Sequence, residues 1–137
     1  MYELFEHTAD IGVRGYGKTI EEAFEETAKA MTSILVDLDT IEEKKTIKIE
    51  AEADTPEELL FEWLNEILAQ IDIEGMIFKK FKITKLKNNK LEAELTGEQL
   101  SPEKHHTKTQ VKAATYSQLK VYKDENGRWI SQCIVDV

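Results

Sequence analysis

Two acidic positions, one near each end of the chain, are the first candidates for chemistry. Asp10 closes a short polar stretch that begins at Glu6 and directly precedes a strand-like run. Asp136 is the penultimate residue, one position from the terminal carboxylate of Val137. Carboxylates held close together repel one another unless a cation or hydrogen-bond donors compensate, and hard cations such as Ca²⁺ choose oxygen ligands. Two simpler interpretations stay open: Asp10 is a turn or cap residue, and the chain end is frayed and solvated.

Nitrogen and sulfur side chains give weaker signals. His7, His105 and His106 have no cysteine partner at the spacing of zinc ligands, which argues against a zinc site. Cys133 alternates with apolar residues, a pattern that predicts a small buried side chain and not a nucleophile. Lys112 is a charge inside a run of small and apolar residues, and its simplest interpretation is a lysine that faces solvent. The sequence contains no nucleophile-elbow, phosphate-loop or dinucleotide motif.

Two helices are predicted to position these side chains. The first begins after a cap at Thr19, has Glu22 three residues later to complete a capping box, and ends near Leu35. The second begins after Thr55 and carries a wide apolar face as far as Ile71, which predicts that it is well buried.

Period-two alternation predicts the strands. Residues 47–53 alternate apolar and charged side chains, and a hairpin over 81–95 turns at Asn88-Asn89. A second hairpin starts at Leu119, turns through 124–127 and runs to the last residue. Because strands and helices do not alternate regularly, we expect an α+β sandwich of antiparallel or mixed sheet with both helices packed on one face, in a single domain over residues 1–137.

Two irregular segments complete the predicted organisation. The glycines at positions 12, 15 and 17 stand between strand-like residues and indicate a bulge or a turn. The polar segment from Lys104 to Thr109 has no pattern, which predicts a mobile loop.

Composition excludes several classes of protein. The 137 residues include 27 acidic and 18 basic side chains, for a net charge of −9, which argues against direct binding of nucleic acid. We expect any RNA to be held by a partner. No apolar run approaches the roughly 20 residues of a membrane span, and no signal peptide is recognisable. A single cysteine then predicts a reduced thiol in a cytoplasmic protein.

Five blocks of sequence together resemble the archease family. In chain order they are HTADIGVRGYGKTIEEAFEETAKAM from residue 7, LLFEWLNEIL from residue 59, the pair GE at 97–98, His105 six residues before VKAATYSQLKV, and the final IVDV. The resemblance covers nearly the whole chain. It implies a small cytoplasmic protein that is not itself an enzyme and acts as a cofactor of an RtcB-type RNA ligase in tRNA splicing and RNA repair. The implied activity is to promote guanylylation of the ligase, to support multiple turnover and to widen nucleotide choice.

The same resemblance assigns roles to individual residues. It implies a Ca²⁺-type site, or a site for another divalent hard cation, built from Asp10, Asp136 and Val137. It implies that Lys112 acts on the ligase or its nucleotide, with Glu22 and His105 as further residues that act toward the partner. Some members of the family carry glutamate before the VKA motif and histidine after its TY pair, where this chain has a glutamine and a serine.

Two other functions stay open at this point. One is a chaperone-like module that modulates a tRNA cytosine methyltransferase, in which case the metal is purely structural. The other is a metal-dependent hydrolase, which has the carboxylates in its favour but lacks a separate base at a recognisable spacing.

Overall fold

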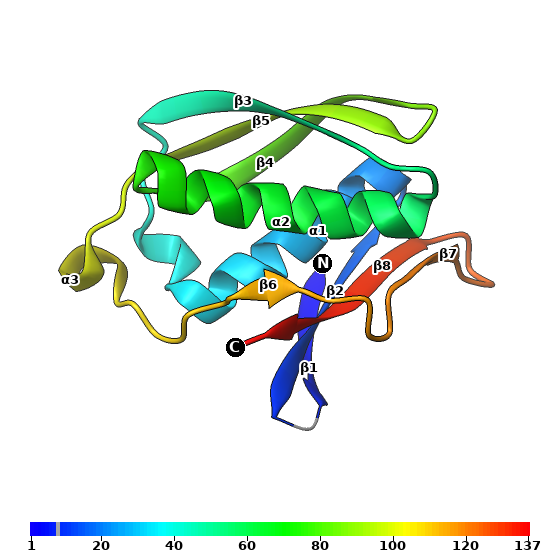
Figure 1. The fold of residues 1–137 in the computed structure, drawn as a ribbon, viewed down its shortest axis with the longest axis horizontal. Helices are drawn as coiled ribbons and strands as arrows, with labels where there is room; N and C mark the ends of the chain where they lie inside the picture. Colours follow the sequence, from blue (N-terminus) through cyan, green and yellow to red (C-terminus); the bar gives the residue numbers. More distant parts are fainter. Residues whose placement is uncertain (8) are drawn as a thin grey trace.

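Two long helices lie between two antiparallel sheets (Figure 1). The computed structural model describes the backbone of residues 1–7 and 9–137, and the side chains of all residues except His7 and Thr8. The predicted α+β class, with two main helices packed against sheet, is confirmed. The prediction for the polar stretch before Asp10 falls partly on His7 and Thr8, which lie outside the described side chains. No helix in the described part is long and apolar enough to cross a membrane.

The larger sheet has five strands, and its central strand is the last element of the chain. Its order is β1 (Tyr2–His7), β2 (Asp10–Gly17), β8 (Trp129–Asp136) and β6 (Ala113–Ala114), with β7 (Lys120–Lys123) also paired to β8. Six consecutive residues of β8 are buried. The hairpin of β7 and β8 predicted at the end of the chain is confirmed, and its second strand, β8, is the central strand of the sheet.

The smaller sheet has the order β3 (Lys45–Glu52), β5 (Lys90–Gln99), β4 (Met76–Lys87). The predicted hairpin is confirmed, and its turn residues Asn88 and Asn89 both adopt left-handed backbone with φ of 53° and 57°. Asparagine tolerates this conformation better than most residues, and two such residues in succession match the twist of the flanking strands.

The two long helices begin and end close to their predicted bounds. α1 spans Ile20–Leu35 and α2 spans Pro56–Glu74. The hydroxyl oxygens of Thr19 and Thr55 each accept a hydrogen bond of 3.1 Å from the backbone N–H three residues later, as the capping pattern predicts. α1 contacts β2, β8 and β4, and α2 contacts β3, β4, β6 and β7, so each helix packs against both sheets.

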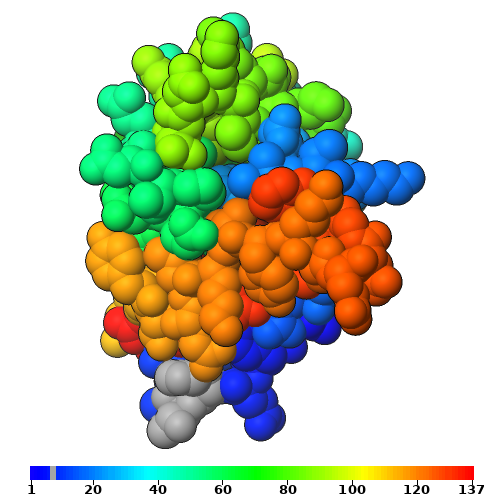
Figure 2. Space-filling view, turned by 90° about the vertical axis from the view of Figure 1, so that its right-hand side faces the viewer, coloured from blue at the N-terminus to red at the C-terminus, as the bar shows by residue number. Residues whose placement is uncertain are grey.

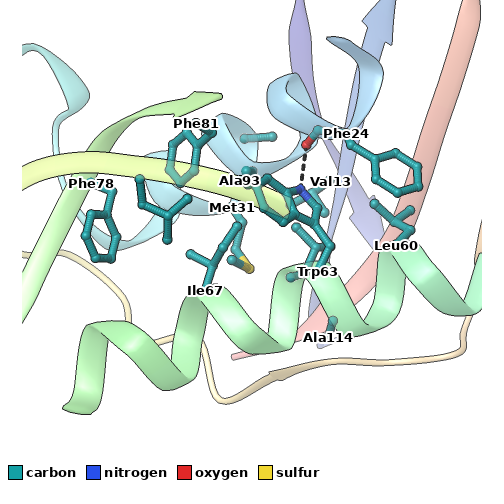
Figure 3. Packing of buried hydrophobic residues seen from close by; sticks show 14 of the residues in the cluster. Val13, Phe24, Met31, Leu60, Trp63, Ile67, Phe78, Phe81, Ala93 and Ala114 are labelled. Atoms are coloured by element: carbon teal, nitrogen blue, oxygen red, sulfur yellow. Dashed lines mark hydrogen bonds between the residues drawn. The ribbon is translucent and has the colours of Figure 1, made fainter. Parts of the chain in front are cut away.

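One continuous core fills the space between the sheets. Trp63 of α2 is fully buried, and its indole nitrogen donates a hydrogen bond of 2.9 Å to the backbone oxygen of Phe24 in α1 (Figure 3). The ring packs edge-on against Phe81 of β4, with 6.5 Å between ring centroids. Trp63 therefore joins both helices and the smaller sheet through apolar contact and one satisfied polar group.

The glycines of β2 do not form a bulge or a turn, so that prediction is wrong. β2 pairs in unbroken register with β1 and with β8. The glycines instead allow close approach: a Cβ at Gly15 would lie 2.2 Å from the backbone oxygen of Ala23, and one at Gly17 would lie 2.6 Å from the backbone nitrogen of Ala23. Because they have no side chain, the first turns of α1 rest directly on the strand.

Gly15→Ala is expected to destabilise the fold strongly. The added methyl group meets helix backbone, which cannot move without shifting α1, and overpacking of this kind costs about 3 kcal/mol of unfolding free energy. Gly12→Ala is the matched control, since its Cβ would meet the ring of Phe5 on the edge strand β1, and a side chain yields more easily. Urea unfolding of both variants measures the difference. Equal losses of unfolding free energy in the two variants would contradict the explanation that α1 needs close approach at Gly15.

The segment predicted as an irregular loop, Lys104 to Thr109, begins in a short helix. α3 spans Pro102–His105, and the hydroxyl of Ser101 caps it. The backbone N–H groups of Lys108 and Thr109 donate to the last carbonyl oxygens of α1, at 2.9 Å and 3.2 Å. The prediction of a loop is wrong for the first two residues, and the Ser-Pro pair before them is the capping signal that could have revealed the helix.

Candidate functional site

One end of the larger sheet brings Asp10, Asp136 and Lys112 together. Asp10 begins β2 and Asp136 ends β8. The last paired residues of these strands are Ile11 and Val135, so the two aspartates occupy the next positions on neighbouring antiparallel strands. On the other side of β8, the backbone N–H of Lys112 donates a 2.8 Å hydrogen bond to the backbone oxygen of Asp136. Three residues that the sequence separates by up to 126 positions therefore meet at one edge of the fold.

The chain end is held in place at this site. Val137 packs against the main hydrophobic core, and the carbonyl of Asp136 is bonded to the segment that precedes β6. The chain end is therefore neither frayed nor fully solvated. The terminal carboxylate follows Asp136 directly on a chain end that is held by packing and by this backbone bond.

The donor set at this end of the sheet suits a hard divalent cation. Asp136 is exposed and Asp10 is half-buried, and neither carboxylate forms a salt bridge within the described residues. Carboxylate oxygens are the kind of ligand that Ca²⁺ prefers, and the two aspartates and the terminal carboxylate offer only oxygen. Among the described side chains, no group of three or more His, Cys, Asp or Glu is arranged to hold a metal.

Lys112 stands exposed beside these acids. The backbone of the residue is held through Asp136, and its amine forms no salt bridge within the part of the chain that the structure describes. Figure 2 shows that the segment after residue 110, in orange, covers the surface between α2 in green and the N-terminal strands in blue, with the red chain end at its edge. The charge of Lys112, an exposed residue, is thus available to a partner.

Glu22 does not share this site. It lies in the first turn of α1, next to Gly17. A Cβ added at Gly17 would lie 2.6 Å from the Cβ of Glu22. Gly17 is the last residue of β2, seven positions from Asp10, and an extended strand covers about 23 Å over that length. Glu22 is exposed and so is free to contact a partner, but on the opposite end of the sheet.

His105 is fully buried, so a partner cannot contact its side chain in the folded protein. Its Nδ1 accepts a 3.0 Å hydrogen bond from the backbone N–H of Ser101, and its Nε2 lies 2.9 Å from Oε2 of Glu98. An Nδ1 that accepts has no proton, so the geometry describes a neutral ring whose Nε2–H donates to the carboxylate. Any part that His105 plays toward a partner is therefore indirect, through the placement of α3.

Glu98 belongs to the GE pair at 97–98 that supports the family resemblance, but the sequence assigned no role to this buried carboxylate. It is 5% exposed, and it accepts hydrogen bonds from His105, from the amine of Lys104 at 2.8 Å and from the backbone N–H of Glu42 at 2.7 Å. The bonds from His105 and Lys104 hold the pKa of Glu98 far below its ordinary value. The carboxylate of Glu98 thus links three separate segments through hydrogen bonds: β5, α3 and the loop before β3.

Glu98→Gln is expected to lower stability at neutral pH and to weaken its acid dependence. The wild-type carboxylate has a depressed pKa in the fold, so its contribution is fully present above about pH 5 and is lost as the pH falls. The groups that face it, His105, Lys104, Glu42 and Lys44, remain in the variant. Urea unfolding at pH 7 and pH 4 measures both effects. An unchanged pH dependence in the variant would contradict this role.

Cys133 lies in β8 with no exposed surface, as its alternation predicts. Burial raises the pKa of its thiol to about 12, so it carries no thiolate at neutral pH. The thiol is a packing group and does not act as a nucleophile.

Comparison with known proteins identifies the family. The profile of the Archease protein family matches residues 2–137. The chain belongs to the archease family. The protein archease of Pyrococcus abyssi is 45% identical over 139 residues, which cover 99% of this chain and 98% of that one. The protein archease of Sulfolobus acidocaldarius is 38% identical over 137 residues with the same coverage.

Two solved structures resemble this fold. The solution structure of Methanobacterium thermoautotrophicum protein 1598 has a TM-score of 0.81 and 33% identity, and the match covers 99% of this chain and 98% of that one. The crystal structure of an archease from Thermotoga maritima, described as a possible chaperone, has a TM-score of 0.64 and 23% identity, and the match covers 100% of this chain and 98% of that one. The second likeness concerns the fold alone.

Proposed function

We propose that this protein activates an RtcB-type RNA ligase in tRNA splicing and RNA repair, without being an enzyme itself. The observation that carries the proposal is the meeting of Asp10, Asp136 and Lys112 at one end of the larger sheet. These are the residues to which the resemblance assigns roles, and membership of the family supports the transfer of those roles. RNA is then contacted through the ligase, in agreement with the net charge of −9.

The chemistry to be assisted is transfer of a guanylyl group to a ligase histidine. Such nucleotidyl transfer depends mainly on positioning and on compensation of phosphate charge. Asp10, Asp136 and the carboxylate of Val137 would hold a divalent cation, which supplies positive charge next to a triphosphate. The flexible side chain of Lys112 adds its positively charged amine on the same face, where it orients a phosphate or a carboxylate of the partner.

The role of the scaffold is to fix these groups relative to one another. Asp136 is hydrogen-bonded through its backbone to Lys112, and the residues next to each of them, Val135, Val137 and Val111, pack in or against the core. A preformed site loses little entropy when a partner binds, so more of the binding energy is available to align the nucleotide.

The test is a multiple-turnover ligation assay with a ligase from the same organism and a labelled RNA substrate. A substoichiometric amount of this protein is expected to raise the amount of ligated RNA beyond one product per ligase. Bovine serum albumin at equal mass serves as the control for non-specific protection. Equal product yields with and without the protein would refute the proposal. Suppression of client aggregation in place of this effect would favour the chaperone-like alternative.

A further inference from the structure

A pocket of about 510 Å³ lies next to Lys112, between the ends of α1 and α2 and the segment 107–112. Its apolar lining comes from the helix ends, β4 and the residue after β5, through Leu35, Leu68, Ile71, Ile77 and Leu100. The segment 107–112 contributes five polar residues and Val111, and Val36 and Asp72 complete the lining. The volume is in the range of ligand-binding pockets, and seven of the thirteen lining residues are aliphatic.

The segment 107–112 is held rigidly by its backbone. Lys108 and Thr109 donate their N–H groups to the carbonyl oxygens of Leu35 and Ile34, and Lys112 donates to Asp136. The side chains of Thr109 and Lys112 are exposed. The pocket is therefore preformed, and its occupant does not have to order a loop.

The two lysines that line the pocket differ in whether their amines are free to pair with an occupant. The amine of Lys108 lies 2.9 Å from Oδ1 of Asp37 and is already engaged. The amine of Lys112 has no salt bridge within the described residues, and Gln110 beside it is neutral. A carboxylate brought by an occupant would thus find a free cation at Lys112, while Asp72 of α2, which also lines the pocket, would repel a second acidic group.

The lining favours an aliphatic side chain over a nucleobase. No aromatic residue is present among the side chains that line this pocket, so a base would have no ring on which to stack. The net charge of −9 also opposes a polyanion. We infer that the pocket anchors a segment of the partner protein in which a leucine, isoleucine or valine fills the pocket and an adjacent aspartate or glutamate pairs with Lys112. The inference rests on the proposed function, because the partner is the ligase.

Filling the pocket tests this inference without disturbing the core. Thr109→Trp places a large ring in the pocket while the backbone bond to Ile34 is kept, and Thr107→Trp does so from a second exposed position. Ile73→Ser is the matched control, since Ile73 is 73% exposed on α2 and does not line the pocket. The dissociation constant for the fluorescently labelled ligase, without RNA, is measured by titration. Both tryptophan variants are expected to raise it about tenfold, the effect of losing one anchor side chain, and Ile73→Ser is expected to leave it unchanged.

The other outcomes separate this inference from the function on which it rests. Wild-type affinity in both tryptophan variants would overturn the pocket assignment and leave the proposed function standing. An affinity loss that appears only when RNA is present would assign the pocket to RNA and also overturn the inference. No binding of the wild-type protein to the ligase would overturn the proposed function and the inference with it.

Discussion

Lys112→Ala is expected to reduce stimulation of the ligase by about 100-fold, the scale seen when one partner of a desolvated charge pair between two proteins is truncated. Lys112 is exposed, and its side chain makes no salt bridge within the described residues, so the truncation removes no internal contact that the structure records. The backbone bond to Asp136 does not depend on the side chain. The variant should therefore fold as the wild type does and fail only toward the partner.

The assay compares ligation rates at the same sub-saturating concentration of each variant. Lys120→Ala is the matched control, because Lys120 is an exposed lysine on the same sheet that pairs with Gln132 in the middle of β8. Lys112→Arg is expected to retain part of the stimulation, since the positive charge is kept. Full stimulation by Lys112→Ala would remove this residue from the site.

Asp10→Ala and Asp136→Ala are expected to abolish stabilisation by Ca²⁺ as well as stimulation of the ligase. A cation that binds only the folded protein at 100 times its dissociation constant stabilises it by about 2.7 kcal/mol. Each aspartate is one of the few acidic ligands proposed for the cation, and no other group of three His, Cys, Asp or Glu among the described residues could replace them. Removal of one aspartate should therefore weaken binding of the cation severely.

Calorimetric titration with CaCl₂ and thermal unfolding in CaCl₂ or EGTA measure the effect directly. Glu50→Ala is the control, because Glu50 is an exposed acid on β3, outside the larger sheet. A wild-type response to Ca²⁺ in either aspartate variant would contradict the assignment. Failure of the wild-type protein itself to bind Ca²⁺, Mg²⁺ or Mn²⁺ would do the same.

The sequence predicts most elements of this fold because their signals are local. The caps at Thr19 and Thr55 and the turn at Asn88-Asn89 each depend on residues within a few positions, and the structure confirms them. A β-bulge between Ile83 and Lys85 breaks the alternation that the sequence suggested for that strand. Next to this irregularity, the carboxylate of Glu25 in α1 accepts a hydrogen bond of 2.8 Å from the backbone N–H of Ile83, and a partner so distant in the sequence leaves no local pattern.

The site could be predicted only in part for the same reason. Asp10, Asp136 and Lys112 were chosen from motifs, but their meeting depends on the register of β2 and β6 against β8, which the sequence does not fix locally. The buried pair of Glu98 and His105 was missed as a pair, because two residues seven positions apart on a strand and a short helix give no periodic signal. Close packing, and not turn chemistry, explains the glycines of β2.

The most direct test of the account measures the covalent intermediate itself. The ligase is incubated with radiolabelled GTP and a divalent metal, with and without a substoichiometric amount of this protein, and the guanylate bound to the ligase is followed over time after denaturing electrophoresis. The account predicts faster and more complete labelling with the wild-type protein, and labelling at the rate of ligase alone with Lys112→Ala or Asp10→Ala. Labelling by the wild-type mixture that is no faster than labelling of the ligase alone would contradict it.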